Sequence, residues 1–314
     1  MRGVNFSVVL TLILAVFFVP VIAGKSNIKT IDKIEQEKSL ASVVQIRPKV
    51  ITTEEIIISP SQTAFQGDTV RVEVRHPKEL KDPYFLYKGK KIKLFKNSDG
   101  TYLGYLGLSA FEKTGSYKLS FCDSTGNLNN SKILNIKVKK YPVQNIVLSG
   151  KSGGITATKE ELRRVQQAKD TVTSVAYWNK VPFTNPTPGC ISSVYGLNRY
   201  YNGVPGTYHK GVDVKAPKGQ TVVATAGGKV LIAKFFRLHG GTVAIDHGHG
   251  VVSMYLHLSK INVKEGEIVK EGQKIAEVGS TGISTGPHLH WGIYVNGVPV
   301  DPFIYWVKPV RKCS

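Results

Sequence analysis

Short runs of β-branched and aromatic residues, separated by glycines, fill the stretch from residue 191 to residue 306, and almost no segment there has helical periodicity. Runs of this kind bounded by turn residues predict β-strands. Strands so closely spaced along the chain are typical of a compact, mostly antiparallel β domain. The predicted strands lie at residues 222–224, 229–233, 242–246, 251–257, 261–263, 274–278 and 289–295.

Two segments within this stretch resemble a known fold. They are KAPKGQTVVATAGGKV at residues 215–230 and VKEGEIVKEGQKIAEVG at residues 263–279. Both are similar to the paired hairpins of a barrel-sandwich hybrid, the fold family that includes lipoyl carriers. We therefore expect one antiparallel β domain of this kind at residues 190–306, followed by a short tail at residues 307–314.

The first half of the chain also carries short strand-like runs, separated by turn residues such as Asp99-Gly100 and Gly115. Residues 69–75 alternate apolar and polar side chains, as a half-buried strand does. Several short strands at this spacing predict a β-sandwich at residues 51–148. The segment TGSYKLSFCDSTGN resembles a bacterial immunoglobulin-like repeat, which implies a binding or spacing module.

One helix is predicted in the linking segment at residues 149–189. Thr158 and Glu161 have the T-x-x-E spacing of a capping box. Apolar residues follow on roughly one helical face, which we expect to pack between the two domains. These residues are Leu162, Val165, Ala168 and Val172. Prolines then become frequent, which predicts a linker before the second domain.

The chain begins with a segment typical of a secretory signal peptide, at residues 1–23. Arg2 precedes an apolar run at residues 8–19, and Ala23 supplies the small residue of a cleavage site. The alternative is an uncleaved anchor, because about 20 apolar residues can span a bilayer. We expect an exported protein, periplasmic or extracellular, with no membrane span after signal removal and a polar lead-in at residues 24–50.

The formal charge of +20, from 42 basic and 22 acidic residues, favours anionic partners. Basic residues are spread over both halves of the chain and do not form one stripe interleaved with aromatic residues. This pattern argues against a nucleic-acid-binding protein. For an exported protein the charge suggests anionic envelope polymers, and plain solubility is the equally open alternative.

Three cysteines in an exported chain allow one disulfide and leave one thiol over. Cys190 and Cys313 bracket the C-terminal half, so a bridge between them would close the ends of that unit. Cys122 lies in a predicted strand, where a buried residue is expected. We therefore expect the disulfide Cys190–Cys313.

Seven of the eight histidines lie between His209 and His290. In GPHLHW, His288 and His290 would share one face of a strand. In HKGVD, His209 and Asp213 are too far apart along a straight strand to reach one ion, so we expect the backbone to turn at Gly211. Each motif alone also fits ordinary surface side chains.

A further histidine ends the predicted strand at residues 251–257. Alternation would place His257 on the same face as Ser253 and Tyr255 and point it into a cleft. An exposed edge face is the alternative. His247 and His249 lie in a glycine-rich stretch and are interpreted as turn or surface residues.

Together, His209, Asp213 and His290 supply two imidazoles and one carboxylate. This is the ligand number of catalytic zinc, where a fourth position stays open for water. A structural zinc site would be closed and usually contains cysteine, and the sequence offers no cysteine pair near these histidines.

The segments YHKGVD, MYLHLSK and GSTGISTGPHLHW, in this order and spacing, resemble the signature motifs of the lysostaphin-type (LytM-like) zinc endopeptidases, which cut peptidoglycan. The resemblance implies one zinc ion held by His209, Asp213 and His290. It also implies that His257 and His288 are the two catalytic histidines.

Members of this family also use a tyrosine shortly before the HxxxD motif to hold the oxyanion. Tyr200, Tyr201 and Tyr208 are candidates, and Tyr201 is our prediction. Some relatives are latent because an upstream residue occupies the open zinc position. Asn179 or Asn185 could do so by sequence position, and an ordinary polar linker is the alternative.

The resemblance implies a zinc endopeptidase that hydrolyses peptide bonds of peptidoglycan, in stem peptides or cross-links, during cell-wall remodelling. The alternative is a non-catalytic envelope protein that binds the wall or activates a cell-wall amidase, as relatives without their metal ligands do. This sequence retains the ligand-type residues and both partner histidines, which favours the enzyme.

Overall fold

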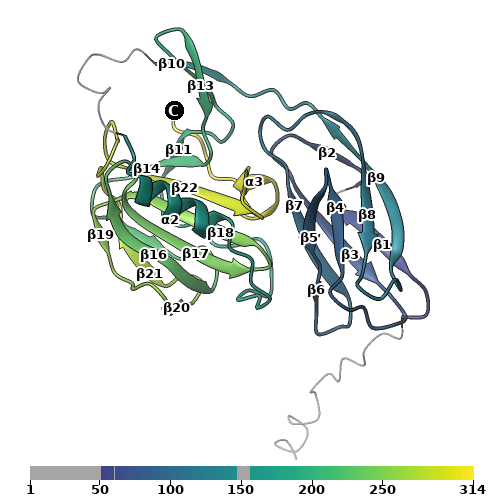
Figure 1. Cartoon of the computed structure of the whole chain (residues 1–314). Helices are drawn as coiled ribbons and strands as arrows, with labels where there is room; N and C mark the ends of the chain where they lie inside the picture. The colour runs from purple at the N-terminus through teal and green to yellow at the C-terminus, as the bar shows by residue number, and fades with distance from the viewer. Residues whose placement is uncertain (1–50, 60, 147–155) are drawn as a thin grey trace, which may run out of the picture. The chain divides into compact units, whose positions relative to one another are not determined.

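The computed structural model describes residues 51–59, 61–146 and 156–314 (Figure 1). The predicted signal peptide at 1–23 and the lead-in at 24–50 lie outside the described residues. The described part is mostly β, as the sequence predicted. Its helices are all too short or too polar to cross a bilayer.

The N-terminal strands form two sheets that share one core. The first has the order β1 (Glu55–Ser59), β3 (Thr69–Arg75), β7 (Tyr102–Gly107), β6 (Phe95–Lys96). The second has the order β2 (Thr63–Phe65), β9 (Asn129–Lys137), β8 (Gly115–Cys122), β4 (Tyr84–Tyr87), β5 (Lys90–Lys93). Alternation in β3 buries its three valines completely, against residues of the second sheet such as Phe121 and Leu134. The immunoglobulin-like character of this sandwich stays a prediction.

One strand of the range assigned to the sandwich pairs elsewhere. β10 (Val143–Ile146) runs parallel to β12 (Asn198–Tyr201), and β12 pairs with β13 (Val204–Tyr208) in a separate three-stranded sheet. The sequence prediction that residues 51–148 form one sandwich is therefore wrong for β10. The strand lies just before the linking segment, so its sequence position did not reveal its partner.

The C-terminal domain is built on one large antiparallel sheet. Its order is β11 (Cys190–Ser193), β14 (Val212–Lys215), β22 (His288–Val295), β18 (Val251–Leu258), β17 (Gly240–Gly248), β16 (Gly228–Phe236), β20 (Ile268–Val269), and β23 (Val298–Val300) pairs with β22. A second sheet has the order β15 (Thr221–Val223), β21 (Lys274–Glu277), β19 (Lys260–Ile261). The short helix α3 (Pro302–Tyr305) follows.

Both faces of the large sheet are covered, which explains why β17 is buried along its whole length. One face packs in a core that includes Val222 and Ile275 of the second sheet. The other face packs on helix α2 (Lys159–Lys169) through Val165 and Ala168.

Helix α2 begins at the predicted capping box, with Thr158 as N-cap. The expectation that it packs between the two domains is wrong, because it lies on β16 and β17 of the large sheet. The predicted apolar face is also wrong in part: the Leu162 side chain is 55% exposed, whereas Glu161 is 1% exposed. A buried carboxylate replaces an apolar residue because it has hydrogen-bond partners in the sheet's loops.

The expected disulfide between Cys190 and Cys313 is present, with the two Cα atoms 4.9 Å apart. The C-terminal tail runs beside β11, where Ile191 N–H donates to Arg311 O and Cys313 N–H donates to Ile191 O. The tail is thereby tied to the strand next to β14. Cys122 is free and only partly buried, contrary to the buried position expected for it.

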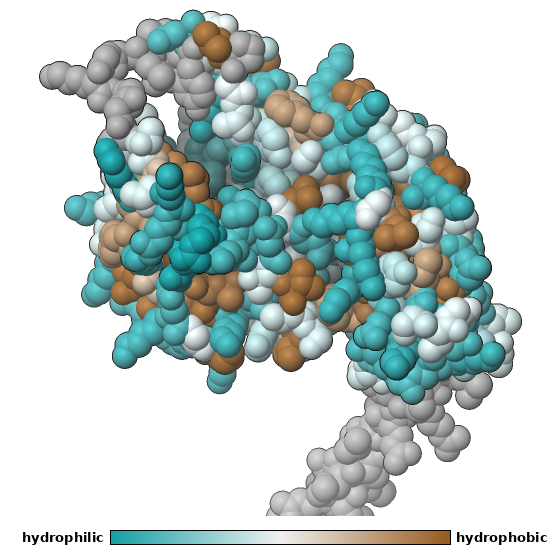
Figure 2. Space-filling view, viewed as in Figure 1, coloured by the Kyte–Doolittle hydropathy of each residue, from teal (hydrophilic) through white to brown (hydrophobic). Residues whose placement is uncertain are grey.

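Hydrophilic residues dominate the visible face in Figure 2, and hydrophobic residues lie between them in small groups. Large apolar side chains exposed by about half or more include Phe235, Ile268 and Val204. Single apolar side chains are common on protein surfaces and do not by themselves indicate a binding site.

Candidate metal centre and catalytic histidines

The centre of the site is a cross-strand pair. β14 and β22 are antiparallel neighbours, and their register places Asp213 directly opposite His290 and Lys215 opposite His288. Directly opposite residues in such a pair point to the same face of the sheet. The prediction that His288 and His290 share one strand face is confirmed, and Leu289 between them is buried on the other face.

His209 reaches this pair from the end of β13. Its N–H donates to Leu197 O, and its own carbonyl accepts from Gly196 N–H, so the segment before β14 is fixed at both sides. Gly211 is needed for close packing here: a Cβ on it would lie 2.4 Å from Trp291 O and 3.0 Å from His290 Nε2. The glycine therefore lets HKGVD lie directly against β22.

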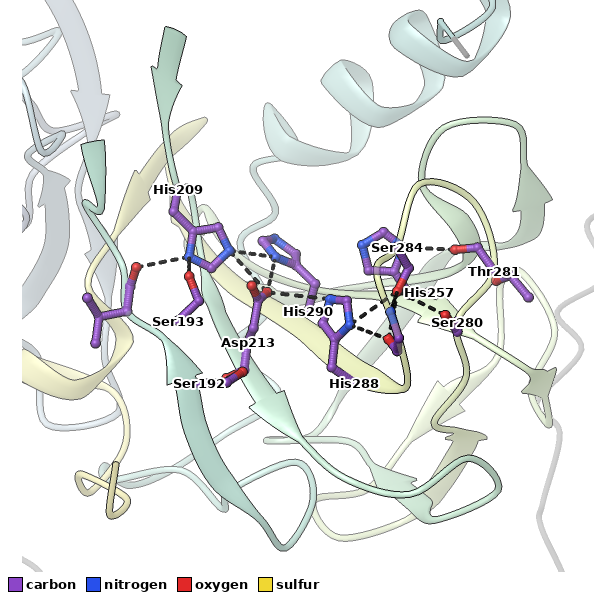
Figure 3. A network of polar contacts seen from close by, with 12 residues as sticks. Ser192, Ser193, His209, Asp213, His257, Ser280, Thr281, Ser284, His288 and His290 are labelled. Atoms are coloured by element: carbon purple, nitrogen blue, oxygen red, sulfur yellow. Dashed lines mark hydrogen bonds and ion pairs between the residues drawn. The ribbon is translucent and has the colours of Figure 1, made fainter. Parts of the chain in front are cut away.

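Three ligand-type atoms converge at this point (Figure 3). His209 Nε2 lies 3.1 Å from Asp213 Oδ1, and His290 Nδ1 lies 2.8 Å from the same oxygen. The two imidazole nitrogens are 3.0 Å apart. A tetrahedral ion bound at about 2.0–2.1 Å separates its ligand atoms by about 3.3 Å, so these atoms fit one common ion after small shifts.

Contacts with groups outside the cluster fix the orientation of the ligand-type side chains. His209 Nδ1 lies 2.9 Å from Val194 O, to which it donates, so its Nε2 presents a lone pair to the cluster. His290 faces the cluster with Nδ1 instead. The second carboxylate oxygen of Asp213 lies 3.7 Å from Arg199 Nη2, so the carboxylate has one oxygen toward the imidazoles and one toward a guanidinium.

The electrostatics favour the metal-binding protonation states. Burial raises the pKa of Asp213, but the close interactions of its carboxylate with the imidazoles of His209 and His290 outweigh it, and the net pKa lies well below the usual value. Burial lowers the pKa of His290 to about 4. Near neutral pH the cluster therefore has an ionised carboxylate and a neutral His290 imidazole, as metal ligation needs.

His257 reaches the site through a β-bulge. The register between β17 and β18 shifts between the pairs Val243–Tyr255 and Gly241–Leu258, so β18 contains one extra residue there. His257 has a φ of 62°, in the left-handed region. A bulge bends the strand and re-aims a side chain, and Leu258 takes the inward position that alternation would have given to His257.

The predicted reason for the orientation of His257 is therefore wrong. Ser253 and Tyr255 do not form a polar face toward a cleft; both are completely buried in the domain core. Ser253 Oγ bonds to Tyr255 Oη and to His247 Nε2, which satisfies all three groups internally. His257 departs from that face because of the bulge.

The imidazoles of His257 and His288 lie side by side next to the metal cluster, with ring centroids 4.9 Å apart (Figure 3). His257 Nδ1 donates to Thr281 O at 2.9 Å, and His288 Nδ1 donates to Gly286 O at 2.8 Å. Each ring thus keeps Nε2 as its proton acceptor. Burial lowers the pKa of His257 to about 4, so this imidazole is neutral at pH 7.

Other histidines and tyrosines lie elsewhere. His249 is a turn residue as predicted, but both it and His247 are buried, so the surface interpretation is wrong. His247 lies in β17 and bonds to Gly227 O at 2.7 Å. Tyr208 packs on the Tyr195 ring, and the Tyr201 side chain lies outside the described residues, so its role stays a prediction.

The alternative of an upstream asparagine that blocks the site finds no support at Asn179. This residue lines a cavity together with Trp178 and His249. His249 precedes β18 and His257 lies near its end, so about 20 Å of strand, at about 3.3 Å per residue, separates the two. Sequence reasoning also missed Arg199 beside Asp213, because nothing in the sequence pattern marks that arginine.

Comparison with known proteins gives a consistent picture. Residues 207–302 match peptidase family M23. Over 93 residues the chain is 45% identical to the peptidoglycan DD-endopeptidase ShyB of Vibrio cholerae, a match covering 30% of this chain and 22% of that protein. Over 112 residues it is 41% identical to the DD-carboxypeptidase/endopeptidase Mpg of Neisseria meningitidis, covering 36% of this chain and 26% of that protein. The chain thus spans about a quarter of the length of these relatives.

A crystal structure of a Pseudomonas aeruginosa protein described as a peptidase M23 has a similar fold. The TM-score is 0.59 at 28% identity, over 76% of this chain and 93% of that one. The residues that match the family include the whole cluster of His209, Asp213 and His290 and both neighbouring histidines. The C-terminal β domain of this chain is therefore a peptidase family M23 domain.

Proposed function

We propose that this domain is a zinc-dependent endopeptidase that hydrolyses peptide bonds of peptidoglycan. The observation that supports it most is the convergence of His209, Asp213 and His290, whose ligand atoms all lie within 4.8 Å of one another. Beside them, His257 and His288 keep their Nε2 atoms as proton acceptors. Few structural roles require five such side chains in one place.

Two imidazoles and a carboxylate with no cysteine are the donor set of catalytic zinc, which fits the residues present. When bound, zinc supplies Lewis-acid activation of water and of the scissile carbonyl. The role of the three side chains is to bind the ion with neutral imidazole and ionised carboxylate. Arg199 holds the other oxygen of Asp213 and so favours binding through one oxygen only.

His257 and His288 are the proposed proton-transfer groups. An Nε2 atom of one ring accepts the proton of the attacking water, and the protonated ring returns it to the leaving amine nitrogen. Anchoring of both Nδ1 atoms to main-chain carbonyls prevents ring flips that would exchange acceptor and donor. Tyr201 as an oxyanion partner remains the sequence-based part of this proposal.

Peptidoglycan is the proposed substrate because relatives with 41–45% identity are named peptidoglycan DD-endopeptidase and DD-carboxypeptidase/endopeptidase. An exported protein, periplasmic or extracellular, would meet this polymer. The net charge of +20 supports additional contact with anionic envelope polymers.

The proposal is tested by digestion of purified muropeptides with the zinc-loaded protein, followed by mass analysis of the products. We expect new peptide termini that identify the bond, and no products after chelation of the metal. Asp213→Ala and His288→Ala serve as inactive references. A zinc-loaded wild-type protein that leaves cross-linked and uncross-linked muropeptides intact would favour the non-catalytic alternative, a wall-binding or amidase-activating protein.

A further inference from the structure

We propose that Glu161 of helix α2 is a positioning residue for the catalytic His257, acting through the loop between β16 and β17. The inference rests on the proposed function. Glu161 lies outside residues 207–302, the part that matches the peptidase family. Its side chain is fully buried although it carries a carboxylate, so its role in the fold needs an explanation.

The carboxylate of Glu161 accepts hydrogen bonds from a loop. β16 ends at Phe236 and β17 begins at Gly240, so the N–H groups between them have no strand partner. Glu161 Oε1 accepts from Leu238 N–H at 3.1 Å and from His239 N–H at 3.0 Å. It also accepts from His239 Nδ1 at 2.6 Å, so one carboxylate fixes both the main chain and a side chain of this loop.

The same loop holds the main chain of His257. His239 O accepts from His257 N–H at 3.1 Å. His257 is in the left-handed region, a conformation that is strained for a residue with a Cβ and persists only where the surroundings hold it. The position of the His239 carbonyl therefore contributes directly to the bulge that aims the imidazole.

The loop also contacts the segment that holds the ring of His257. Leu238 O accepts from Ile283 N–H at 2.9 Å, and a Cβ on Gly240 would lie 2.4 Å from Thr281 O. Thr281 O is the atom that accepts from His257 Nδ1. The loop thus touches both supports of His257, one at its main chain and one at its ring.

Glu161 has a second role that must be separated from the first. It is the N3 residue of the capping box, in which Thr158 Oγ1 accepts from Glu161 N–H at 3.1 Å. Glutamine also serves at this position of a capping box. Glu161→Gln therefore retains the helix start. It replaces one of the two acceptor oxygens by an NH₂ group, which cannot accept hydrogen bonds from the N–H groups of the loop.

The test compares three variants of the full zinc-loaded chain: Glu161→Gln, Thr158→Ala and Glu160→Gln. Thr158→Ala removes the side-chain cap of helix α2 and should lower the melting temperature without touching the loop. Glu160 is exposed and binds Lys234. We expect Glu161→Gln to lower kcat on muropeptides about tenfold to hundredfold, as a misplaced catalytic group does. The KM of Glu161→Gln should stay within about twofold of wild type, as should kcat and KM of both control variants. The zinc content of all three variants should not change.

A second readout does not need turnover. The His257 backbone amide and imidazole Nδ1 resonances in ¹⁵N spectra should shift in Glu161→Gln and stay in place in both control variants. Unchanged kcat and unchanged His257 resonances in Glu161→Gln would overturn the positioning role, as would an equal loss of kcat in Thr158→Ala. If the wild type itself has no hydrolase activity, the proposed function fails and the resonances still decide the structural link.

Discussion

Asp213 and His290 lie directly opposite each other on the paired strands β14 and β22, with Asp213 Oδ1 2.8 Å from His290 Nδ1. The two residues are 77 positions apart in the sequence. Hydrogen bonds of the β ladder set the spacing of these two residues, so two of the three proposed metal ligands stand on paired strands. Placement on a sheet keeps the ligand geometry fixed before an ion arrives.

We expect Asp213→Ala to abolish stoichiometric zinc binding. Loss of an outer partner alone typically costs about 10–100-fold in metal affinity, and loss of a ligand costs more. His288→Ala should keep the zinc and lower kcat/KM by about 10²–10⁴-fold, the usual contribution of a proton-transfer group. Metal analysis and muropeptide kinetics on the same samples check both; equal zinc loss in the two variants would contradict the division of roles.

Gly211→Ala should damage the site without changing any ligand. The new Cβ would lie 2.4 Å from Trp291 O and 3.0 Å from His290 Nε2, so β14 and β22 must separate. Overpacking of this kind costs about 1–3 kcal/mol. We expect a lower melting temperature and weaker zinc binding. Gly286→Ala is the matched control, because a Cβ there meets no atom within 4 Å; equal effects of the two changes would refute the packing argument.

Removal of the disulfide should destabilise the domain. The Cys190–Cys313 bridge closes a loop with a sequence separation of 123. Chain entropy then predicts a loss of about 4–5 kcal/mol in the free energy of unfolding on Cys190→Ala. Denaturant unfolding measures it, with Cys122→Ala as the control for a free thiol. A change of less than about 1 kcal/mol would show that the tail is held by its other contacts.

Acid should destabilise the domain through His247, a completely buried histidine. Burial lowers its pKa to about 4 from 6.5. The folded state keeps this imidazole neutral, while the unfolded state takes up a proton below pH 6.5. The contribution of neutral His247 to the free energy of unfolding is therefore complete above pH 6.5 and is lost as the pH falls toward 4. At pH 5 the loss is about 2 kcal/mol.

His247→Gln removes this titration. The difference in unfolding free energy between pH 7 and pH 5 should therefore be about 2 kcal/mol smaller in the variant than in wild type. Denaturant titrations at the two pH values give the comparison directly. An identical pH dependence in both proteins would mean that other groups carry the acid sensitivity.

Much of the site could be predicted from the sequence. The HxH motif indicated a shared strand face because alternation along a strand is a local property, and His288 and His290 do share one. The HxxxD motif indicated a bend because two ligands four residues apart cannot reach one ion from a straight strand. Both inferences used only geometry within a few residues.

The missed features depend on distant partners. The bulge at His257 arises from the register between β17 and β18, which no local pattern specifies. Glu161 was read only as a helix cap, because its loop partners Leu238 and His239 lie 77 and 78 residues away. Likewise, β10 joined β12 through pairing that the strand's own sequence does not encode.

We propose that three side chains hold one zinc ion beside two catalytic histidines. Anomalous diffraction at the zinc edge, from crystals of the zinc-loaded protein, locates that ion. We expect one anomalous peak about 2.0–2.2 Å from His209 Nε2, Asp213 Oδ1 and His290 Nδ1. A peak bound to other residues, or none at this cluster in protein that cleaves muropeptides, would contradict it.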